Sequence, residues 1–338
     1  MTADGRPGDG PTPGPPPPVV VLGLPRSGTT WTAHLLACAP GTVAVLEPDN
    51  EKTQVAAVEA KAGVGRFPVL RPGDDAEAYA RLWAWALHGA EPTAAQRLAG
   101  RLFHRADPGQ LEALAAGRPS PRLRLAGRLA RPPRAVAGSE GSGRRVVAKS
   151  VHAPLAAEWL ADRLAVSVVV VLRHPANVLA SWLALDLPDR DRHLETVTAV
   201  REHYLERWDV APPGRGAGAL DRAVWQLGLL TAALEEAADG HPQWLVRRHE
   251  ELCARPEDEF RRLYQALDLV WTDRAGQELA ASDRPGEGFS LTRRAADLAD
   301  GWRRRLGPEE VAALRRGLAP FPLRRWRPGD LGDDACAG

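Results

Sequence analysis

The sequence has 338 residues, which is long enough for one large α/β domain or two smaller ones with a well-buried core. Its 44 basic and 43 acidic side chains leave a formal net charge of +1, so overall charge does not favour nucleic acid or a membrane surface as a partner. No stretch approaches the ~20 apolar residues of a membrane span, and the three cysteines show no metal-ligand or redox spacing. We therefore expect a cytoplasmic protein without a transmembrane segment.

The first 18 residues are almost wholly Gly, Pro and small polar residues, so we expect a disordered tail with little apolar surface to bury. A second flexible tail is expected at 328–338. The sequence between them favours a single domain over 19–327. Its first element is Val19–Leu22, whose unbroken apolar character predicts a strand buried on both faces of a parallel sheet.

A turn rich in small residues follows this strand and opens a helix. Gly23 and Gly28 allow backbone conformations that a Cβ would oppose, and the Ser and Thr residues around Gly28 place hydroxyls beside the free N–H groups of a helix start. Arg26 adds a positive charge to this anion-attracting helix end. The two glycines have the spacing of the G-x-x-x-x-G-K-[ST] phosphate loop, but Thr29 stands where the lysine should be. The turn therefore predicts a phosphate cradle with a displaced cation.

A second strand is predicted at 42–46, after a helix over 29–39 that ends before a Pro-Gly pair. This strand delivers Glu47 into the following loop. Because loops at the carboxyl ends of parallel strands line the ligand crevice, Glu47 is expected near the phosphate cradle as a candidate general base. A helix-capping or Arg-paired carboxylate is an equally consistent interpretation of the sequence alone.

Residues 74–100 have the apolar spacing of a helix, and the segment that follows differs sharply in composition. Residues 101–145 carry many Arg and Pro residues and end in a Gly- and Ser-rich run. We expect a basic, mobile insertion there. The sequence leaves open whether it folds over an acceptor or is merely a solvated excursion.

A third strand is predicted to begin at Val146 and to end near Lys149, one of only three lysines in the chain. A lone Lys among many Arg residues is a candidate for a specific task. His152 follows the strand, and a helix with an apolar stripe is expected over 154–163.

The most continuous β-branched run, Ser167–Leu172, predicts a central strand. It ends at Arg173, and the next helix places Ser181 eight residues later. A guanidinium at a strand end can bind phosphate oxygens while a helical hydroxyl donates from the side. These two residues are a second candidate phosphate site. The remaining sequence is mostly helical, with a short strand at 244–246 and helices expected within 191–208, 220–239 and 250–269.

Together, these motifs resemble the sulfotransferases that use 3′-phosphoadenylyl sulfate (PAPS). P-R-S-G-T-T-W after a strand resembles the family's loop for the 5′-phosphosulfate, which here comprises Pro25, Arg26, Ser27, Gly28, Thr29, Thr30 and Trp31. The spacing R-x-P-x-x-x-x-x-S, from Arg173 to Ser181, resembles the family's 3′-phosphate motif. The resemblance spans about Val19 to Leu318. It implies a P-loop-like three-layer α/β fold, with a mainly parallel sheet flanked by helices.

The resemblance also implies the chemistry. A sulfuryl group would pass from PAPS, as co-substrate, to a hydroxyl or amine of a carbohydrate, lipid or specialised metabolite, with no metal. Arg26 would hold the 5′-phosphosulfate and Lys149 would lie near the transferring group or leaving oxygen. In the stretch 286–318, the resemblance makes Arg293 and Arg294 candidate phosphate ligands. A simple Arg-rich surface is an equally consistent interpretation of this pair.

The family offers two patterns for the general base, and the sequence contains a candidate for each. Cytosolic members use a His in a K-T-H-type motif, whereas several carbohydrate and protein-tyrosine members use a Glu after the second strand. His152 stands three residues after Lys149 instead of two, while Glu47 fits the second pattern in its E-P context. We therefore favour Glu47 over His152, and a relationship closer to bacterial and carbohydrate-type members than to the cytosolic branch.

Two other classes of protein remain as alternatives. A P-loop kinase or nucleoside triphosphatase is disfavoured because the loop lacks its lysine and there is no obvious metal-binding acidic strand end. A non-catalytic relative that retains the nucleotide site is the other alternative. The sequence identifies neither the acceptor nor the oligomeric state.

Overall fold

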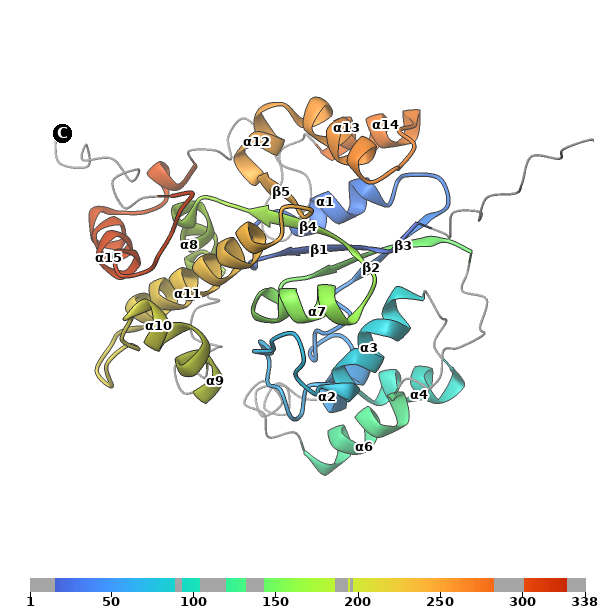
Figure 1. Cartoon of the computed structure of the whole chain (residues 1–338), viewed down its shortest axis with the longest axis horizontal. Coiled ribbons are helices and arrows are strands. Elements are labelled where there is room, and N and C mark those ends of the chain that lie inside the picture. The colour runs from blue at the N-terminus through green and yellow to red at the C-terminus, as the bar shows by residue number, and fades with distance from the viewer. Residues whose placement is uncertain are drawn as a thin grey trace, which may run out of the picture.

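The structure, a computed structural model, describes residues 16–88, 93–103, 120–131, 143–185, 194, 197–282 and 301–326. Its centre is a five-stranded sheet in the order β2-β3-β1-β4-β5, and all four strand pairings are parallel. The strands are β1 (Val19–Gly23), β2 (Thr42–Leu46), β3 (Arg145–Ser150), β4 (Ser167–Leu172) and β5 (Leu245–Arg248). The prediction of a parallel α/β fold is confirmed (Figure 1).

Helices cover both faces of the sheet because both faces of its inner strands are apolar. Val19 and Val21 of β1 belong to one buried cluster, whereas Val20 and Leu22 belong to the other, as the two-residue repeat of a strand requires. Figure 1 shows one helical layer on each side of the sheet. The layer above contains α1 (Thr29–Leu36), α12 (His249–Ala254), α13 (Pro256–Ala266) and α14 (Asp273–Ser282).

The opposite layer is larger and is built around α11 (Ala219–Gly240), which contacts β4, α7, α8 and α15. The predicted helix at 154–163 begins as a 3-10 turn, Pro154–Ala156, before α7. The other elements here are α7 (Ala157–Arg163), α8 (Pro175–Leu183), α9 (Thr198–Val200), a π-helical turn (Arg201–Leu205), α10 (Glu206–Trp208), a 3-10 turn (Gly301–Arg304) and α15 (Pro308–Leu318). No helix in the described part of the chain is long and apolar enough to cross a membrane.

A helical group between β2 and β3 differs in detail from the sequence-based expectation. The stretch 74–100 contains all of α3 (Glu77–Leu87) and most of α4 (Ala94–Phe103), and α2 (Val55–Ala60) precedes them. Within the expected insertion at 101–145, α6 (Pro121–Ala130) packs against α2 and α4. Leu123 and Ala126 are its buried contacts, so this part is not a solvated excursion. Residues 104–119 and 132–142 lie outside the described part.

Candidate functional site

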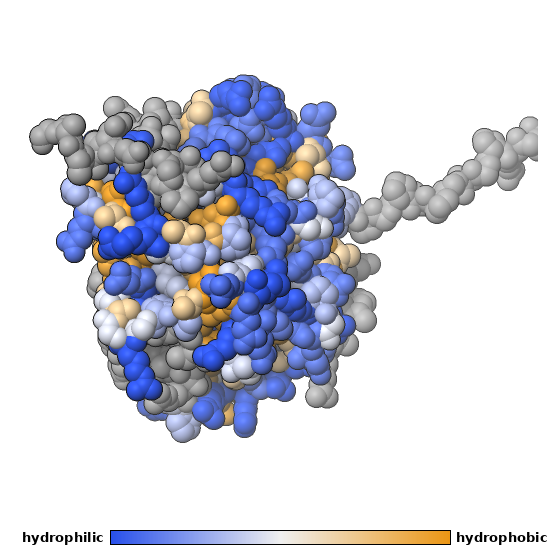
Figure 2. Space-filling view, turned by 60° about the vertical axis from the view of Figure 1, so that its left-hand side comes forward, coloured by the Kyte–Doolittle hydropathy of each residue, from blue (hydrophilic) through white to orange (hydrophobic). Residues whose placement is uncertain are grey.

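All five strands end at the same edge of the sheet, where the predicted site residues lie. In the strand register, Leu46 pairs with Lys149, Leu22 with Ser150 and Gly23 with Val171. The loops after these strands are therefore neighbours, as expected for the ligand crevice of a parallel sheet. Figure 2 turns this edge toward the viewer and shows apolar side chains near the middle of the face, framed by hydrophilic ones.

The first loop has the backbone geometry of an open helix end. Gly28 is the N-cap of α1, has φ 93° and provides no side-chain cap. A Cβ there would approach the His249 ring to 2.4 Å, so both the conformation and the space require glycine. The hydroxyl of Ser27 is buried without a hydrogen-bond partner. These features leave the first N–H groups of α1 and a hydroxyl available to an anion.

The two predicted phosphate motifs contact each other directly. Arg26, with φ 73°, donates from Nε to Ser181 Oγ at 3.0 Å. Arg173 donates from a terminal guanidinium nitrogen to the Arg26 carbonyl at 2.7 Å, and the Trp182 indole donates to the Pro25 carbonyl at 2.9 Å. Arg173 and Trp182 therefore hold the backbone of the first loop through two hydrogen bonds, and Ser181 holds the Arg26 side chain through a third.

Arg173 is a buried cation with unused bonding capacity. Burial lowers its pKa to about 10, against the opposing attraction of Glu250, so the guanidinium stays charged at neutral pH. Its Nε is buried without a hydrogen-bond partner. A buried charged donor without a partner is costly, and a bound anion would supply the missing acceptor.

Glu47 and Lys149 form an ion pair at the ends of β2 and β3. The second Glu47 carboxylate oxygen accepts a hydrogen bond from the Val151 backbone at 3.2 Å, and the Glu47 N–H donates to the Lys149 carbonyl at 2.7 Å. Burial raises the pKa of Glu47, opposed by Lys149 and reinforced by Asp49. Glu47 also has φ 51°, a left-handed conformation that costs on the order of 1 kcal/mol outside glycine.

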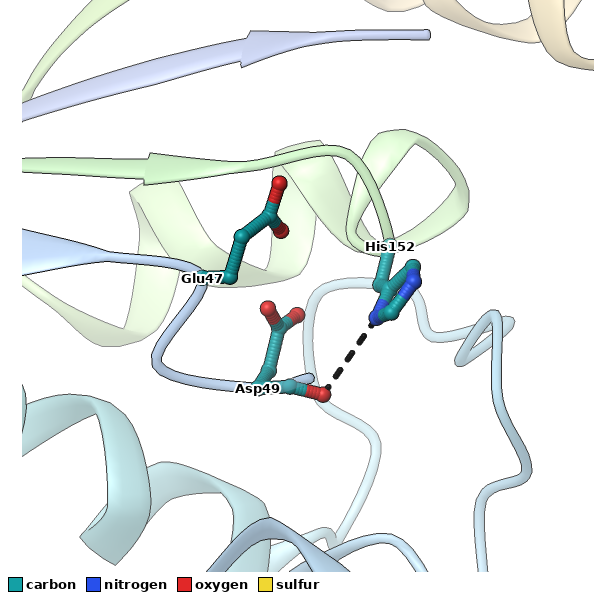
Figure 3. Close-up of side chains that lie close together, drawn as sticks. All are labelled: Glu47, Asp49 and His152. Carbon is teal, nitrogen blue, oxygen red and sulfur yellow. Dashed lines mark hydrogen bonds between the residues drawn. The ribbon is translucent and has the colours of Figure 1, made fainter. Parts of the chain in front are cut away.

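His152 is buried beside both cations and carboxylates, and its Nδ1 lies 3.8 Å from a Glu51 carboxylate oxygen. Its Nδ1 lies 3.5 Å from the Asp49 backbone carbonyl (dashed in Figure 3), and its Nε2 lies 3.5 Å from the Arg66 guanidinium. Burial lowers its pKa well below the usual range, assisted by Lys61 and Arg66. The ring is therefore neutral at neutral pH in the folded protein.

Replacing His152 with glutamine is expected to reduce the loss of unfolding free energy that the protein shows as pH falls. Because the unfolded state takes up a proton near pH 6.5 and the folded state does not, stability falls as pH drops below that value, by up to about 1.4 kcal/mol per pH unit. Thermal unfolding from pH 7.5 to 5 measures this slope. The same substitution at His88, whose ring is exposed, is the control; equal slopes for wild type and His152→Gln would contradict the prediction.

Glu47, Asp49 and His152 also form a group that could offer metal-ligand atoms, all within 4.8 Å of one another. The sequence did not reveal this cluster. Asp49 accepts hydrogen bonds at 2.7 Å from both Tyr79 and Ser150, and Glu47 is paired with Lys149. Protein donors already engage both carboxylates, which favours a hydrogen-bonded network over a metal centre.

Several predicted and unpredicted residues take informative positions. The Trp31 indole donates to Ser282 on α14 at 2.9 Å and packs edge-on against Phe260, so it braces α1 from the side. Residues Arg293 and Arg294 lie outside the described part of the chain.

His249, at the end of β5, packs against Gly28 and was not anticipated. His249 follows β5, more than 200 residues after Gly28 in the sequence. No local pattern around Gly28 therefore indicates this contact.

The residues around the first loop are suited to bind anionic groups. The test is the set of buried donors without partners: the Ser27 hydroxyl and Nε of Arg173. Ser27 lies in the loop that joins β1 to α1, and Arg173 lies between β4 and α8. Two anionic groups would supply acceptors at these two places.

Three solved structures illustrate what the chain is similar to. A sulfotransferase domain from the curacin biosynthetic pathway shares 13% identity, covers 91% of this chain and 99% of its own length, and has a TM-score of 0.45. A Mycobacterium avium sulfotransferase shares 16%, covers 91% and 78%, and scores 0.39. A retinol dehydratase in complex with retinol and PAP shares 18%, covers 93% and 84%, and scores 0.39. A search of curated proteins found no match.

A family comparison gives a broader result. The model described as "Sulfotransferase family" matches residues 17–273, which include the strand-loop-helix unit at Val19–Leu36, the Glu47–Lys149 pair and the Arg173–Ser181 segment. The match covers well over half of the chain. The chain therefore belongs to the sulfotransferase family.

Proposed function

We propose that this protein transfers a sulfuryl group from PAPS to a hydroxyl or amine of a small-molecule or glycan acceptor. The observation that carries the proposal is the direct contact between the two phosphate motifs, Arg26 to Ser181 and Arg173 to Arg26, beside the Glu47–Lys149 pair. This arrangement suits a ligand with two separated phosphate groups and a reacting group between the loops.

The chain's own residues have distinct tasks in this proposal. The α1 N–H groups, Ser27 and Arg26 hold the 5′-phosphosulfate, while Arg173 and Ser181 hold the 3′-phosphate. When bound, PAPS supplies an activated sulfuryl group and a phosphate leaving group. Lys149 stabilises the negative charge that develops on the bridging oxygen. Positioning and electrostatic stabilisation are expected to dominate, as in phosphoryl transfer.

Glu47 is the proposed general base, which accepts the proton of the acceptor hydroxyl or amine. Its raised pKa makes it a stronger base than an ordinary carboxylate, yet its pairing with Lys149 favours the ionised form that can accept a proton. His152 is a weaker candidate because burial, with Lys61 and Arg66 nearby, lowers its pKa. The acceptor is proposed to be a carbohydrate, lipid or specialised metabolite, and the apolar centre of the face in Figure 2 favours one with an apolar portion.

Calorimetry with 3′-phosphoadenosine 5′-phosphate (PAP) tests the nucleotide part of the proposal. We expect PAP to bind without magnesium and ATP to compete poorly. Tighter binding of magnesium-ATP than of PAP would favour a P-loop kinase or triphosphatase instead. Incubating a metabolite extract with PAPS and searching by mass spectrometry for a sulfation shift tests turnover. Binding of PAP without any sulfated product would favour a non-catalytic relative.

A further inference from the structure

Asp49 connects three separate elements at the edge of the site, although it is completely shielded from solvent. Its carboxylate accepts hydrogen bonds at 2.7 Å from Tyr79 of α3 and from Ser150, the last residue of β3. Its backbone carbonyl accepts a bond at 2.9 Å from Lys61, which follows α2. Each of these bonds ties the loop after β2 to a different part of the domain.

The hydrogen bonds of Asp49 lie next to Glu47 and Lys149 in the sequence. Ser150 follows Lys149 directly, and Asp49 lies two residues after Glu47. The Asp49–Ser150 bond therefore joins the two chain segments that carry the ion pair. Figure 3 shows the Glu47 and Asp49 side chains rising from the same loop on the side facing β3. Because Glu47 has a left-handed backbone conformation, the surrounding contacts must hold it in place.

We propose that Asp49 is a positioning residue, held by Tyr79 and Ser150, that fixes Glu47 against Lys149 in the orientation needed to accept a proton. This inference rests on the proposed function of Glu47. Two properties support it beyond the geometry. The Asp49 charge helps to raise the pKa of Glu47, behind the larger effects of burial and Lys149. Burial and Asp49 together raise the pKa of Tyr79, so its hydroxyl remains a donor.

The first experiment replaces Asp49 with asparagine, which keeps the shape and removes the charge. We expect kcat to fall by about 10- to 100-fold through misplacement of the base, with PAP affinity retained. We also expect the acid limb of the pH–rate profile to move to lower pH, because a negative neighbour of Glu47 is lost. The matched control is Glu235→Gln, a buried carboxylate that accepts backbone bonds from residues 324 and 325, away from the crevice. If Asp49→Asn loses stability but keeps both kcat and the acid limb, as this control should, the proposal is wrong.

If Asp49→Asn does not fold, a second pair of variants tests the positioning role of Asp49. Tyr79→Phe removes one hydrogen bond to Asp49 and leaves its charge, so kcat should fall without a downward shift of the acid limb. Tyr264→Phe is the control, since this equally buried tyrosine donates to the Leu35 carbonyl on the other face of the sheet. Equal kcat for the two tyrosine variants would overturn the proposal.

A third measurement needs no substrate and separates this inference from the proposed function. A proton on Glu47 stabilises the fold at low pH, and that contribution is lost as pH rises through the raised pKa of Glu47. The difference in unfolding free energy between wild type and Glu47→Gln reports this loss, which should occur at lower pH in the Asp49→Asn background. No such shift would overturn the coupling of Asp49 to Glu47. A clear shift in a protein that transfers no sulfuryl group would refute only the proposed function.

Discussion

Replacing Glu47 with glutamine is expected to lower kcat by about 10²- to 10⁴-fold, the usual loss when a general base is removed. Glutamine has nearly the same shape but cannot accept the acceptor's proton. PAP affinity should stay nearly unchanged, because the carboxylate of Glu47 pairs with Lys149 and the Val151 backbone of β3 and the segment after it, and not with the phosphate loop. Initial rates with PAPS and a sulfated-product readout, combined with calorimetry of PAP, measure both quantities.

The pH dependence of kcat/KM is a second test of the role of Glu47. Because burial raises the pKa of Glu47, the acid limb of kcat/KM should lie above the ~4.3 of an ordinary glutamate. Activity is lost as pH falls through this value, since protonated Glu47 cannot act as a base. The limb should disappear in the glutamine variant.

The control for this experiment is His152→Ala. It removes the competing candidate, which is buried and lies beside Arg66. We expect a folded variant that retains substantial turnover. Should the Glu47 variant keep near-normal turnover while a folded, PAP-binding His152 variant is inactive, His152 would be the base and our assignment would be wrong.

Replacing Arg173 with alanine is expected to weaken PAP binding by about 1.5 to 3 kcal/mol, or roughly 10- to 150-fold, the cost of losing a charge-assisted hydrogen-bond partner. Arg173 is buried, carries a charge and has a buried Nε donor without a hydrogen-bond partner. Ser181→Ala should weaken binding in the same direction by a smaller factor, since a neutral hydroxyl is lost. Calorimetry with PAP measures both effects.

Selectivity for the 3′-phosphate distinguishes a phosphate ligand from a residue that only braces the loop. Arg173 also holds the Arg26 carbonyl, so a purely bracing role would weaken all nucleotides equally. We expect adenosine 5′-phosphate, which lacks the 3′-phosphate, to lose far less affinity than PAP. Arg163→Ala, an exposed arginine paired with Glu77, serves as the control. An unchanged ratio of the two affinities in Arg173→Ala would contradict the assignment.

Contacts between distant segments explain where the sequence-based expectations were incomplete. For the segment that contains α6, the sequence left open a fold over an acceptor or a solvated excursion, whereas Leu123, Ala126 and Gly127 are buried and α6 contacts α2 and α4. Composition reports that most of its surface is polar. It does not indicate that a narrow apolar stripe packs against other helices, one of which, α2, begins more than 60 residues earlier in the chain.

The sequence by itself determined the features that depend on neighbours along the chain. The apolar strand β1, the glycine at φ 93° that opens α1, and the placement of Ser181 on the helix after Arg173 all follow from short-range rules of backbone and helix geometry. Only the tertiary structure decided that Arg26 contacts Ser181 across 155 residues and that Asp49 fastens the loop of Glu47 to β3. It also decided that His152 is buried near Lys61 and Arg66. The physical reason is that burial, charge environment and hydrogen-bond partners arise from packing of distant segments, which no local residue pattern encodes.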